Sequence, residues 1–566
     1  MAKFYDEIPE SLIEWIKKQH MFWVASAPLS PDGHINLSPK GTADSFHVVN
    51  SRRVWYQDLT GSGVETISHI RENGRVTILF SAFEGPPRIL RLFGTGTVYE
   101  FGTEEYEYLI SPETRKPGSR AAIVIDVYQC QTTCGFAVPI YDFVTHRTQL
   151  LRMADMDESR NCVSSTVSSS ETDKKGIKAR WARNNLRSID GLPGLLVAPD
   201  SKVTPVNNFN KESQRPKLRY SSSREGSSQS SGANVAIGFA LGALVATAIP
   251  YILSVTRNLV MHLFLLRDGR LKVKSGLSHL FYWNTSQRLI GSPHSPLVRS
   301  SKRMIIPMAK YYDEIPESLI EWVRKQHMFW VASAPLGPGG HVNVSPKGTA
   351  ECFHVVNSHR VWYEDLTGSG VETISHIREN GRITILFHSF EGPPRILRLY
   401  GTGTVYEYGT QEYESLIPPE TRKPGSRAAI VIDVYQCLTS CGYAVPIYDF
   451  VTHRTQLLRS FDIKESHDRA TVSTEINPKG LRAYWMRQNL SSVDGLPGLL
   501  TAPESKATCS SVFDKGPRPK LHRLSSRDAG VLGTGATLAI GCAIGALVAT
   551  ALPRILSVTG NFGTRT

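Results

Sequence analysis

The segment Thr60-Gly61-Ser62-Gly63-Val64-Glu65-Thr66 has the residue types of an anion-binding loop followed by the start of a helix. Backbone N–H groups at a helix start have no partner within the helix and lie at the positive end of its dipole, so they attract phosphate. The hydroxyl groups of Thr60, Ser62 and Thr66 would add donors. Because a plain helix cap has a similar composition, the segment alone predicts either a phosphate site or a capped helix.

Two other expected strands could bring positive charge to this loop. Ser38 and Lys40 lie in Ser38-Pro39-Lys40-Gly41, at the end of one strand. Arg88 and Arg91 lie on a later strand, and residues three apart on a strand point to opposite faces, so at most one of the two faces the site. If the loop binds a phosphate-bearing cofactor, the candidate binding residues are Ser38, Lys40, Thr60, Ser62, Thr66 and, as the choice between the two arginines, Arg91.

Residue patterns for other kinds of catalysis are not evident. The sequence has no Gly-x-Ser-x-Gly turn, no Walker A loop and no His-Glu-x-x-His motif. His34, His47 and His69 are more typical of structural or surface positions. Cys130 and Cys134 have no further ligands nearby at metal spacing, which favours structural or incidental thiols over a redox pair or a metal site. No catalytic residue is assigned, and no metal site is predicted.

The elements that would position these residues are short strands separated by Gly and Pro. Strands are expected at residues 20–27, 35–40, 53–59, 75–83, 88–100 and 120–128. Helices are expected at residues 7–19, where apolar residues form a stripe, and at 64–73, which ends at Asn73-Gly74. About six strands with one or two helices favour a small antiparallel barrel.

This unit occurs twice in the chain. Met308 restarts the sequence that begins at Met1, and the copies stay in register through Arg152 and Arg459, with roughly 22 differences over about 150 positions. The second copy carries the same expected cofactor-binding residues, namely Ser345, Lys347, Thr367, Ser369, Thr373 and Arg398. Two adjacent units are joined here, either by a real fusion or by a faulty coding model. A native product with about half the mass of the full chain would support the second alternative.

The positive charge of the chain lies outside the repeated units. The formal net charge is +13, yet residues 1–152 carry 15 Lys/Arg and 17 Asp/Glu, and residues 308–459 carry 14 and 16. Neither copy has the basic surface of a nucleic-acid-binding domain, so no nucleic-acid partner is expected. Basic segments that lie beside apolar stretches indicate a membrane surface instead.

The sequence predicts seven segments. They are a first domain (1–152), a basic Ser-rich tether with a short docking helix around Trp181 (153–232), an apolar span (233–255), a basic linker (256–307), a second domain (308–459), a tether (460–530) and a second span (531–553). Each uncharged span is long enough to cross a bilayer, with a buried core helix as the alternative. Each unit is typical of a tail-anchored membrane protein with a cytosolic domain, and the organelle is not indicated. One crossing by the first span would place the two domains on opposite sides.

The arrangement resembles the pyridoxamine 5′-phosphate oxidase-related family of FMN-binding split β-barrels. The residues that carry the resemblance are 34–41, 53–63, 67–80 and the tail motif 188–194, and it covers about residues 5–150 and 312–457. The resemblance implies a mainly β fold with some helix, in two tandem split barrels. It also implies FMN at an interface, formed by a homodimer or by pairing of the barrels, with its phosphate near the helix start. The substrate would be an unknown small molecule.

One departure from the family affects the phosphate site. The oxidase has a Ser-Arg-Lys clamp at this helix start, whereas this chain has Val64-Glu65-Thr66, repeated as Val371-Glu372-Thr373. A carboxylate near a phosphate dianion is unfavourable unless it points away. Two functions follow from the resemblance. One is a membrane-tethered, flavin-dependent oxidoreductase, and the other is a non-catalytic barrel that binds flavin, haem or a protein partner at a membrane surface.

Overall fold

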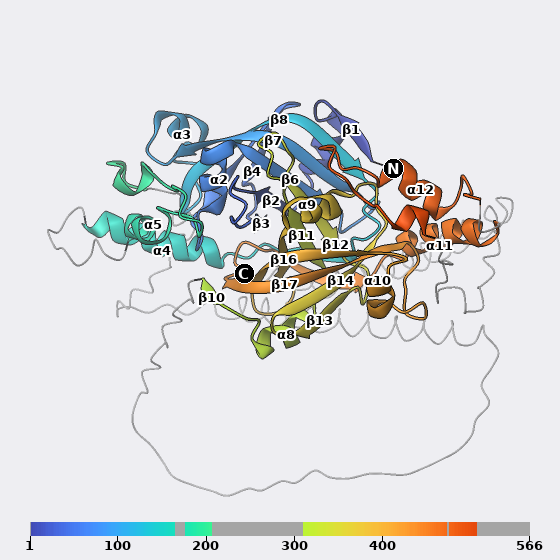
Figure 1. Cartoon of the computed structure of the whole chain (residues 1–566). Helices are drawn as coiled ribbons and strands as arrows, with labels where there is room; N and C mark the ends of the chain where they lie inside the picture. Colours follow the sequence, from blue (N-terminus) through green and yellow to red (C-terminus); the bar gives the residue numbers. More distant parts are fainter. Residues whose placement is uncertain (1, 165–175, 206–308, 472–474, 506–566) are drawn as a thin grey trace, which may run out of the picture. The chain divides into compact units, whose positions relative to one another are not determined.

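The computed structural model describes residues 2–164, 176–205, 309–471 and 475–505. The predicted spans at 233–255 and 531–553 lie outside these residues. Within the described ranges, no helix is long and apolar enough to cross a membrane. The described residues of both copies belong to one compact unit (Figure 1).

Copy 1 is one antiparallel sheet with helices packed on it. Its strands follow the order β3-β2-β6-β7-β8-β5-β4, and β1 pairs with β8. Its elements are β1 (Lys3–Tyr5), α1 (Glu10–Ile16), β2 (Phe22–Ser26), β3 (Asn36–Lys40), β4 (Phe46–Asn50), β5 (Arg53–Leu59), α2 (Glu65–Asn73), β6 (Arg75–Ser81), β7 (Ile89–Glu100), α3 (Glu104–Leu109), β8 (Ser119–Thr133), β9 (Ile140–Thr145), α4 (Gln149–Ser164), α5 (Ile177–Asn184) and the 3₁₀ helix η2 (Ala198–Asp200).

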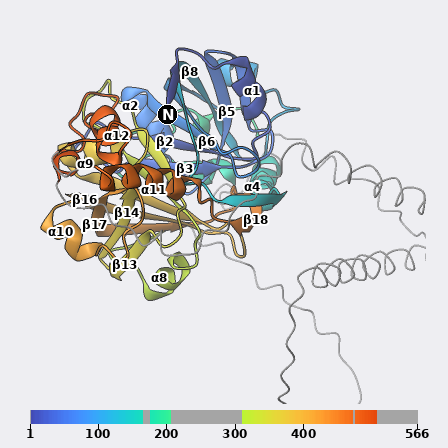
Figure 2. The same ribbon diagram turned by 90° about the vertical axis from the view of Figure 1, so that its right-hand side faces the viewer.

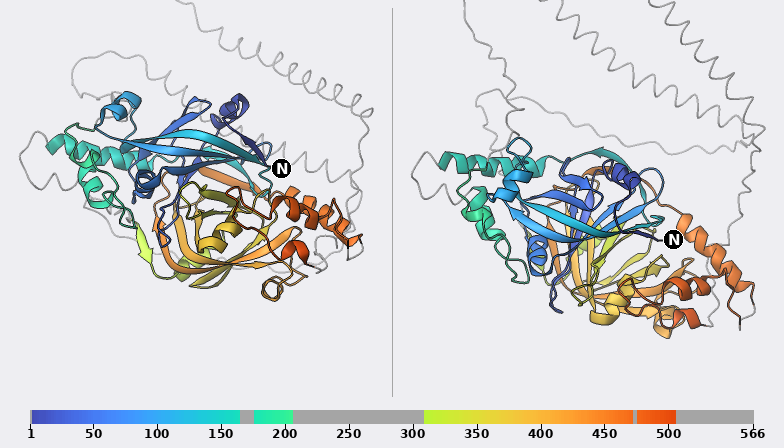
Figure 3. Two further views of the ribbon diagram at one scale, coloured as in Figure 1. Left: turned by 45° about the horizontal axis from the view of Figure 1, so that its top comes forward. Right: turned by 90° about the horizontal axis from the view of Figure 1, so that it is seen from above.

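Copy 2 repeats this sheet, with the order β12-β11-β15-β16-β17-β14-β13 and β10 paired with β17. Figure 3 shows the sheet of each copy bent rather than flat, as the natural twist of strands requires. Its elements are β10 (Lys310–Tyr312), α8 (Glu317–Val323), β11 (Phe329–Ser333), β12 (Asn343–Lys347), β13 (Phe353–Asn357), β14 (Arg360–Leu366), α9 (Glu372–Asn380), β15 (Arg382–His388), β16 (Ile396–Glu407), α10 (Gln411–Leu416), β17 (Ser426–Ser440), β18 (Ile447–Thr452), α11 (Gln456–Arg469), α12 (Leu481–Gln488) and η3 (Ala502–Glu504).

The mainly β sheet fold expected from the sequence is confirmed, and β5 begins and ends where expected. Helix α1, which lies beside the sheet in Figure 2, begins later than expected because Pro9 precedes it in an extended conformation, with ψ 144°. It ends at Ile16, before the expected end at residue 19. Helix α4 crosses the expected domain boundary at residue 152. It belongs to the fold because Glu158, 2% exposed, accepts a 2.7 Å hydrogen bond from Arg115 Nη2.

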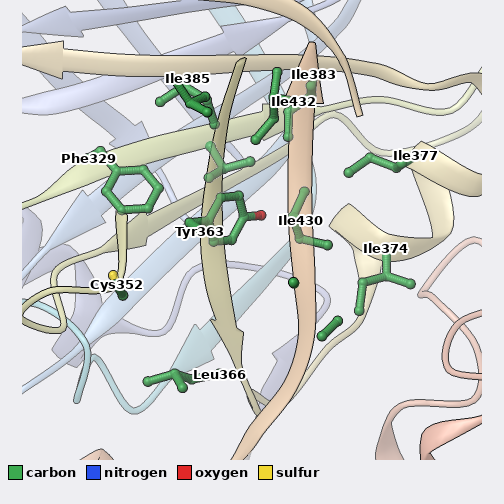
Figure 4. Packing of buried hydrophobic residues seen from close by; sticks show 14 of the residues in the cluster. Phe329, Cys352, Tyr363, Leu366, Ile374, Ile377, Ile383, Ile385, Ile430 and Ile432 are labelled. Carbon is green, nitrogen blue, oxygen red and sulfur yellow. The ribbon is translucent and has the colours of Figure 1, made fainter. Parts of the chain in front are cut away.

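The core of each copy lies between the bent sheet and its central helix. In copy 2, Ile374 and Ile377 of α9 face Ile430 and Ile432 of β17 (Figure 4). The spacing of three residues puts both helix side chains on one face. Copy 1 repeats this packing with Ile67 and Ile70 of α2. Burial of this face fixes the position of each helix start relative to the sheet.

The two copies contact each other through a shared core and reciprocal hydrogen bonds. Trp23 and Trp330 are both fully buried in one apolar cluster, with ring centroids 4.9 Å apart. The Thr77 hydroxyl donates to Val342 O at 2.6 Å, and the equivalent Thr384 hydroxyl donates to Ile35 O at 2.8 Å. Strands β9 and β18 also pair antiparallel. The two copies therefore form a pseudosymmetric pair through equivalent contacts.

Candidate functional site

The Gly-rich loop connects β5 to α2 and leaves the start of the helix open. Val64 occupies the N-cap position of α2 and makes no side-chain cap hydrogen bond. A Cβ added at Gly61 would meet nothing within 4 Å, so there is open space beside the loop. The first-turn N–H groups of α2 therefore have no side-chain cap and can serve an anion.

The tail helix α5 packs against the same loop through Trp181, which is fully buried. Its indole Nε1 donates to the Thr60 hydroxyl at 2.6 Å, and that hydroxyl donates in turn to Gly118 O at 2.7 Å. The predicted docking helix around Trp181 is therefore present. Thr60 fixes the loop to the tail, so its hydroxyl is already engaged on both sides.

Two cations flank a buried carboxylate beside the loop. Lys40 Nζ donates to Asp58 Oδ1 at 2.7 Å, and Arg120 Nε donates to Asp58 Oδ2 at 2.9 Å. Burial works to raise the pKa of Asp58, which is 1% exposed, but the two cations outweigh burial and lower the pKa. Asp58 is therefore ionised and holds both cations in place. Two cations with one carboxylate leave a net positive charge here.

Two cavities lie where the copies meet, and residues from both copies line each of them. Site A is lined by Ser38, Lys40, Gln57, Thr60, Ser62, Glu65, Thr66 and Arg120 of copy 1 together with Tyr311, Arg398, Tyr400 and others of copy 2. Site B is lined by Ser345, Lys347, Glu364, Thr367, Ser369, Glu372, Thr373 and Arg427 of copy 2 together with Arg91, Phe93, Gln131 and others of copy 1. The empty space of each site, its open mouth included, is about 990 Å³ for site A and 1090 Å³ for site B.

All twelve predicted site residues line these cavities, but the two arginines are exchanged between the copies. Arg398 of copy 2 lines site A with Lys40, and Arg91 of copy 1 lines site B with Lys347. Arg398 Nε donates to Leu37 O and Arg91 Nε donates to Val344 O, each at 2.8 Å. The structure thus does not bring Arg91 to Lys40, although both belong to copy 1.

Glu65 and Glu372, which stand where the family has a cation, also line the sites. A Cβ added at Gly63 would lie 2.2 Å from Glu65 Oε2, so this carboxylate folds back over the loop. In site B, burial lowers the pKa of Arg91 to about 10, and the negative charge of Glu372 acts against that lowering. The arginine of the opposite copy therefore supplies the positive charge that the helix start lacks.

The residues of site A fit a phosphate-bearing group. Arg120 is 4% exposed, and its Nη1 atom is buried without a hydrogen-bond partner among the described residues. An unsatisfied buried donor costs about 1–3 kcal/mol, which an anionic ligand oxygen would recover. Lys40, Arg398 and the open helix start add donors of the kind that phosphate prefers.

A polar network ties the tail motif to the wall of site A. Asp190 accepts hydrogen bonds from His34 Nδ1 at 2.5 Å and from the His34 backbone N–H at 3.0 Å. Burial works to raise the pKa of Asp190, but the interactions with His34 and His69 outweigh burial and hold the pKa well below its usual range. Asn36, the first residue of β3, lies two residues after His34 and donates to the Thr66 hydroxyl at 2.9 Å. The tail motif therefore supports the strand and the helix start that form the site.

The C-x₃-C cysteines are free thiols in the structure. Burial raises the pKa of Cys130 to about 11, and its Sγ donates to Glu7 O at 3.3 Å. Cys134, four residues along, is exposed. Across the residues that the structure describes, no group of three or more potential ligands could hold a metal ion.

Sequence reasoning missed Arg120 and Tyr400. Arg120 lies at the start of a long strand, just after the Lys-Pro-Gly turn. The local sequence around Arg120 does not indicate that it contacts Asp58, which lies on another strand. Tyr400 replaces Phe93 of copy 1. Because the copies are otherwise nearly identical, this difference could have indicated that the position lines a site and that the two sites are unequal.

Both copies match one family of known proteins. The family model for pyridoxamine 5′-phosphate oxidase matches residues 8–134 and 315–441, one match in each copy. A pyridoxamine 5′-phosphate oxidase family protein of Aspergillus flavus, ustO, is 39% identical over an alignment of 217 residues, and the match covers 36% of this chain and 81% of that protein.

Two solved structures are similar at lower identity. HupZ of group A Streptococcus is 21% identical over 21% of this chain and 90% of its own, with a TM-score of 0.18. A pyridoxinephosphate oxidase family protein of Clostridium acetobutylicum, related to general stress protein 26, is 14% identical over 24% of this chain and 92% of its own, with a TM-score of 0.17. Because both TM-scores are below 0.5, neither similarity supports a conclusion about this chain. The family-model matches and the Aspergillus relative show that the chain belongs to the pyridoxamine 5′-phosphate oxidase family.

Proposed function

We propose that this chain is an FMN-dependent oxidoreductase that binds its cofactor in the cavities between its two copies. The observation that carries the proposal is the convergence, in site A, of the uncapped start of α2 with Lys40 and with Arg398 from the other copy. Family membership supports a flavin ligand. FMN joins a phosphate to a planar ring system, and the lining of site A includes both cations and aromatic side chains.

The residues of site A would divide the work of holding FMN. Lys40, Arg120, Arg398 and the first N–H groups of α2 would hold the phosphate, with the hydroxyls of Ser62 and Thr66 as further donors. Bound FMN would supply hydride or electron transfer. Tyr400, which is 3% exposed, would wall the ring against water. We assign no side chain as general acid or base.

An absorbance spectrum of the full chain after addition of FMN and gel filtration tests this proposal. Oxidised-flavin bands that co-elute with the protein are the expected result, and the paired substitution Lys40→Ala with Lys347→Ala should weaken binding. Lys17→Ala is the matched control, because the Lys17 side chain is 56% exposed, pairs with nearby Glu14 and does not line site A. A Soret band would instead favour haem, and a colourless protein that retains neither ligand would favour a non-catalytic, partner-binding role.

We further propose that the apolar segments 233–255 and 531–553 attach the chain to a membrane, with the folded copies cytosolic. The length of each uncharged segment and the basic residues around them support this proposal. Resistance of the chain to carbonate extraction would be the expected result. Release of the full-length chain into the soluble fraction would contradict it.

A further inference from the structure

We propose that the two composite sites are unequal, and that site A binds the phosphate of FMN more tightly than site B. This inference rests on the proposed function and deepens it. The copies are nearly identical around the helix start, so the inequality comes from a few differences in residue type and hydrogen bonding at the cavity walls. Three of them act in the same direction.

The first difference is a buried charge. Gln57 lines site A, and the equivalent Glu364 lines site B and is 3% exposed. Both side chains accept a hydrogen bond from the following turn, Gln57 from Lys116 N at 3.0 Å and Glu364 from Lys423 N at 2.8 Å. Lys423 Nζ lies 3.3 Å from Glu364 Oε2 and offsets part of its charge. Site B nevertheless has one more carboxylate, and Lys423 is drawn toward it.

The second difference is the availability of a guanidinium donor. Arg120 and Arg427 both donate through Nε to the central aspartate, at 2.9 Å in each copy. Arg427 Nη1 also donates to Gly370 O at 2.9 Å, on the loop of site B. Arg120 Nη1 has no partner among the described residues and is buried. A ligand oxygen in site A would thus gain a donor that site B has already used.

The third difference concerns the arginine from the opposite copy. In site B, Arg91 Nη1 donates to Gln131 Oε1 at 3.0 Å. In site A the position of Gln131 is Leu438, and Arg398 Nη1 reaches only the Ser440 hydroxyl, at 3.5 Å. Arg398 is therefore held less firmly by its own copy and is freer to donate to a ligand.

The aromatic residues that line the two cavities differ as well. Site A is walled by Tyr400 and Tyr311, whereas site B has Phe93 in the position of Tyr400. The phenol groups give site A hydrogen-bonding capacity that a phenylalanine lacks. The duplication makes such divergence possible. In a homodimer any substitution changes both sites, but here a substitution in either copy changes the two sites differently.

Titration of the full chain with FMN, followed by quenching of flavin fluorescence, tests the inference. We expect one equivalent to bind at least about tenfold more tightly than the second, a difference of about 1.4 kcal/mol. Gln57→Glu should weaken the tight phase, and its mirror change Glu364→Gln should tighten the weak phase. Asp126→Asn, at an exposed ion pair, is the control that should alter neither.

Riboflavin, which lacks the phosphate, separates the possible causes. If the phosphate ends of the sites cause the inequality, riboflavin should show a smaller difference between the two phases than FMN does. Two equal FMN sites, unaffected by either mirror substitution, would overturn this inference and leave the proposed function standing. An absence of any FMN binding would overturn the proposed function itself, and the inference with it.

Discussion

Replacing Asp58 with asparagine should lower stability while leaving the phosphate site more positive. Asp58 is 1% exposed and lies 2.7 Å from Lys40 Nζ and 2.9 Å from Arg120 Nε. Neutralising one member of a buried ion pair typically costs about 3–5 kcal/mol, because the remaining charge is left without compensation. The Lys40 side chain is 18% exposed and keeps some hydration, so we expect the lower end, about 3 kcal/mol.

Thermal unfolding measures this loss of stability. For a domain of this size, about 3 kcal/mol corresponds to a fall in Tm of roughly 6–12 °C. Asp126→Asn is the matched control, since Asp126 lies 2.6 Å from Arg53 Nε but both side chains are more than half exposed. Removing that exposed pair should cost less than about 1 kcal/mol. Equal losses in the two variants would refute the view that the Lys40–Asp58–Arg120 cluster is a buried ionic support.

The same Asp58→Asn variant also tests how Asp58 affects FMN binding. Without the carboxylate, Lys40 and Arg120 no longer share their charge with Asp58, so FMN should bind at least as tightly as in the unmodified chain. The titration is run well below the lowered Tm. Weaker binding there would mean that Asp58 is needed to hold the cations in position, and that its charge does not compete with the ligand.

Three further predictions follow from other contacts. Trp181→Ala removes a fully buried indole and should cost about 3–5 kcal/mol in urea unfolding, with faster proteolysis of the tail. Because the pKa of Asp190 is lowered on folding, its contribution to stability should be complete above about pH 4 and be lost as the pH falls further. In Asp190→Asn, the free energy of unfolding should fall less steeply over this acidic range. In double-mutant cycles of FMN binding at the tight site, Lys40→Ala should couple with Arg398→Ala and be additive with Arg91→Ala. Additivity in both cycles would contradict the exchange of arginines.

The local parts of the site could be predicted from the sequence because their signals are short-range. The Gly-rich loop, the helix that ends at Gly74 and the strand of Lys40 each follow from neighbouring residues. Gly74 has φ +74°, the left-handed conformation that favours glycine at a helix end. The resemblance then favoured a phosphate site over a plain helix cap for this loop.

The resemblance implied a site at an interface between barrels, but the exchange of the two arginines between the copies could not be predicted from one copy. Arg91 lies on the correct face of a correctly expected strand, yet that face points into the other copy. Spacing along a strand tells which residues share a face but not what that face meets. The contacts that decide it, such as Arg91 Nε with Val344 O at 2.8 Å, join residues more than 250 positions apart. Arg120 was missed for the same reason, because its partner Asp58 lies on another strand.

The pairing of the copies also constrains the predicted membrane segments. A single crossing at 233–255 would put the copies on opposite faces, and the bond from Thr77 to Val342 O could not form within one chain. A single crossing and pairing within the chain therefore exclude each other. Separate units, or pairing between chains, would still build complete cavities, but like copies would combine Lys40 with Arg91. Site A, with Lys40, Arg398 and Tyr400 together, arises only when unlike copies meet. Like copies would also give two kinds of site, so unequal affinities alone do not identify the pairing, whereas coupling of Lys40→Ala with Arg398→Ala in FMN binding would report that unlike copies pair.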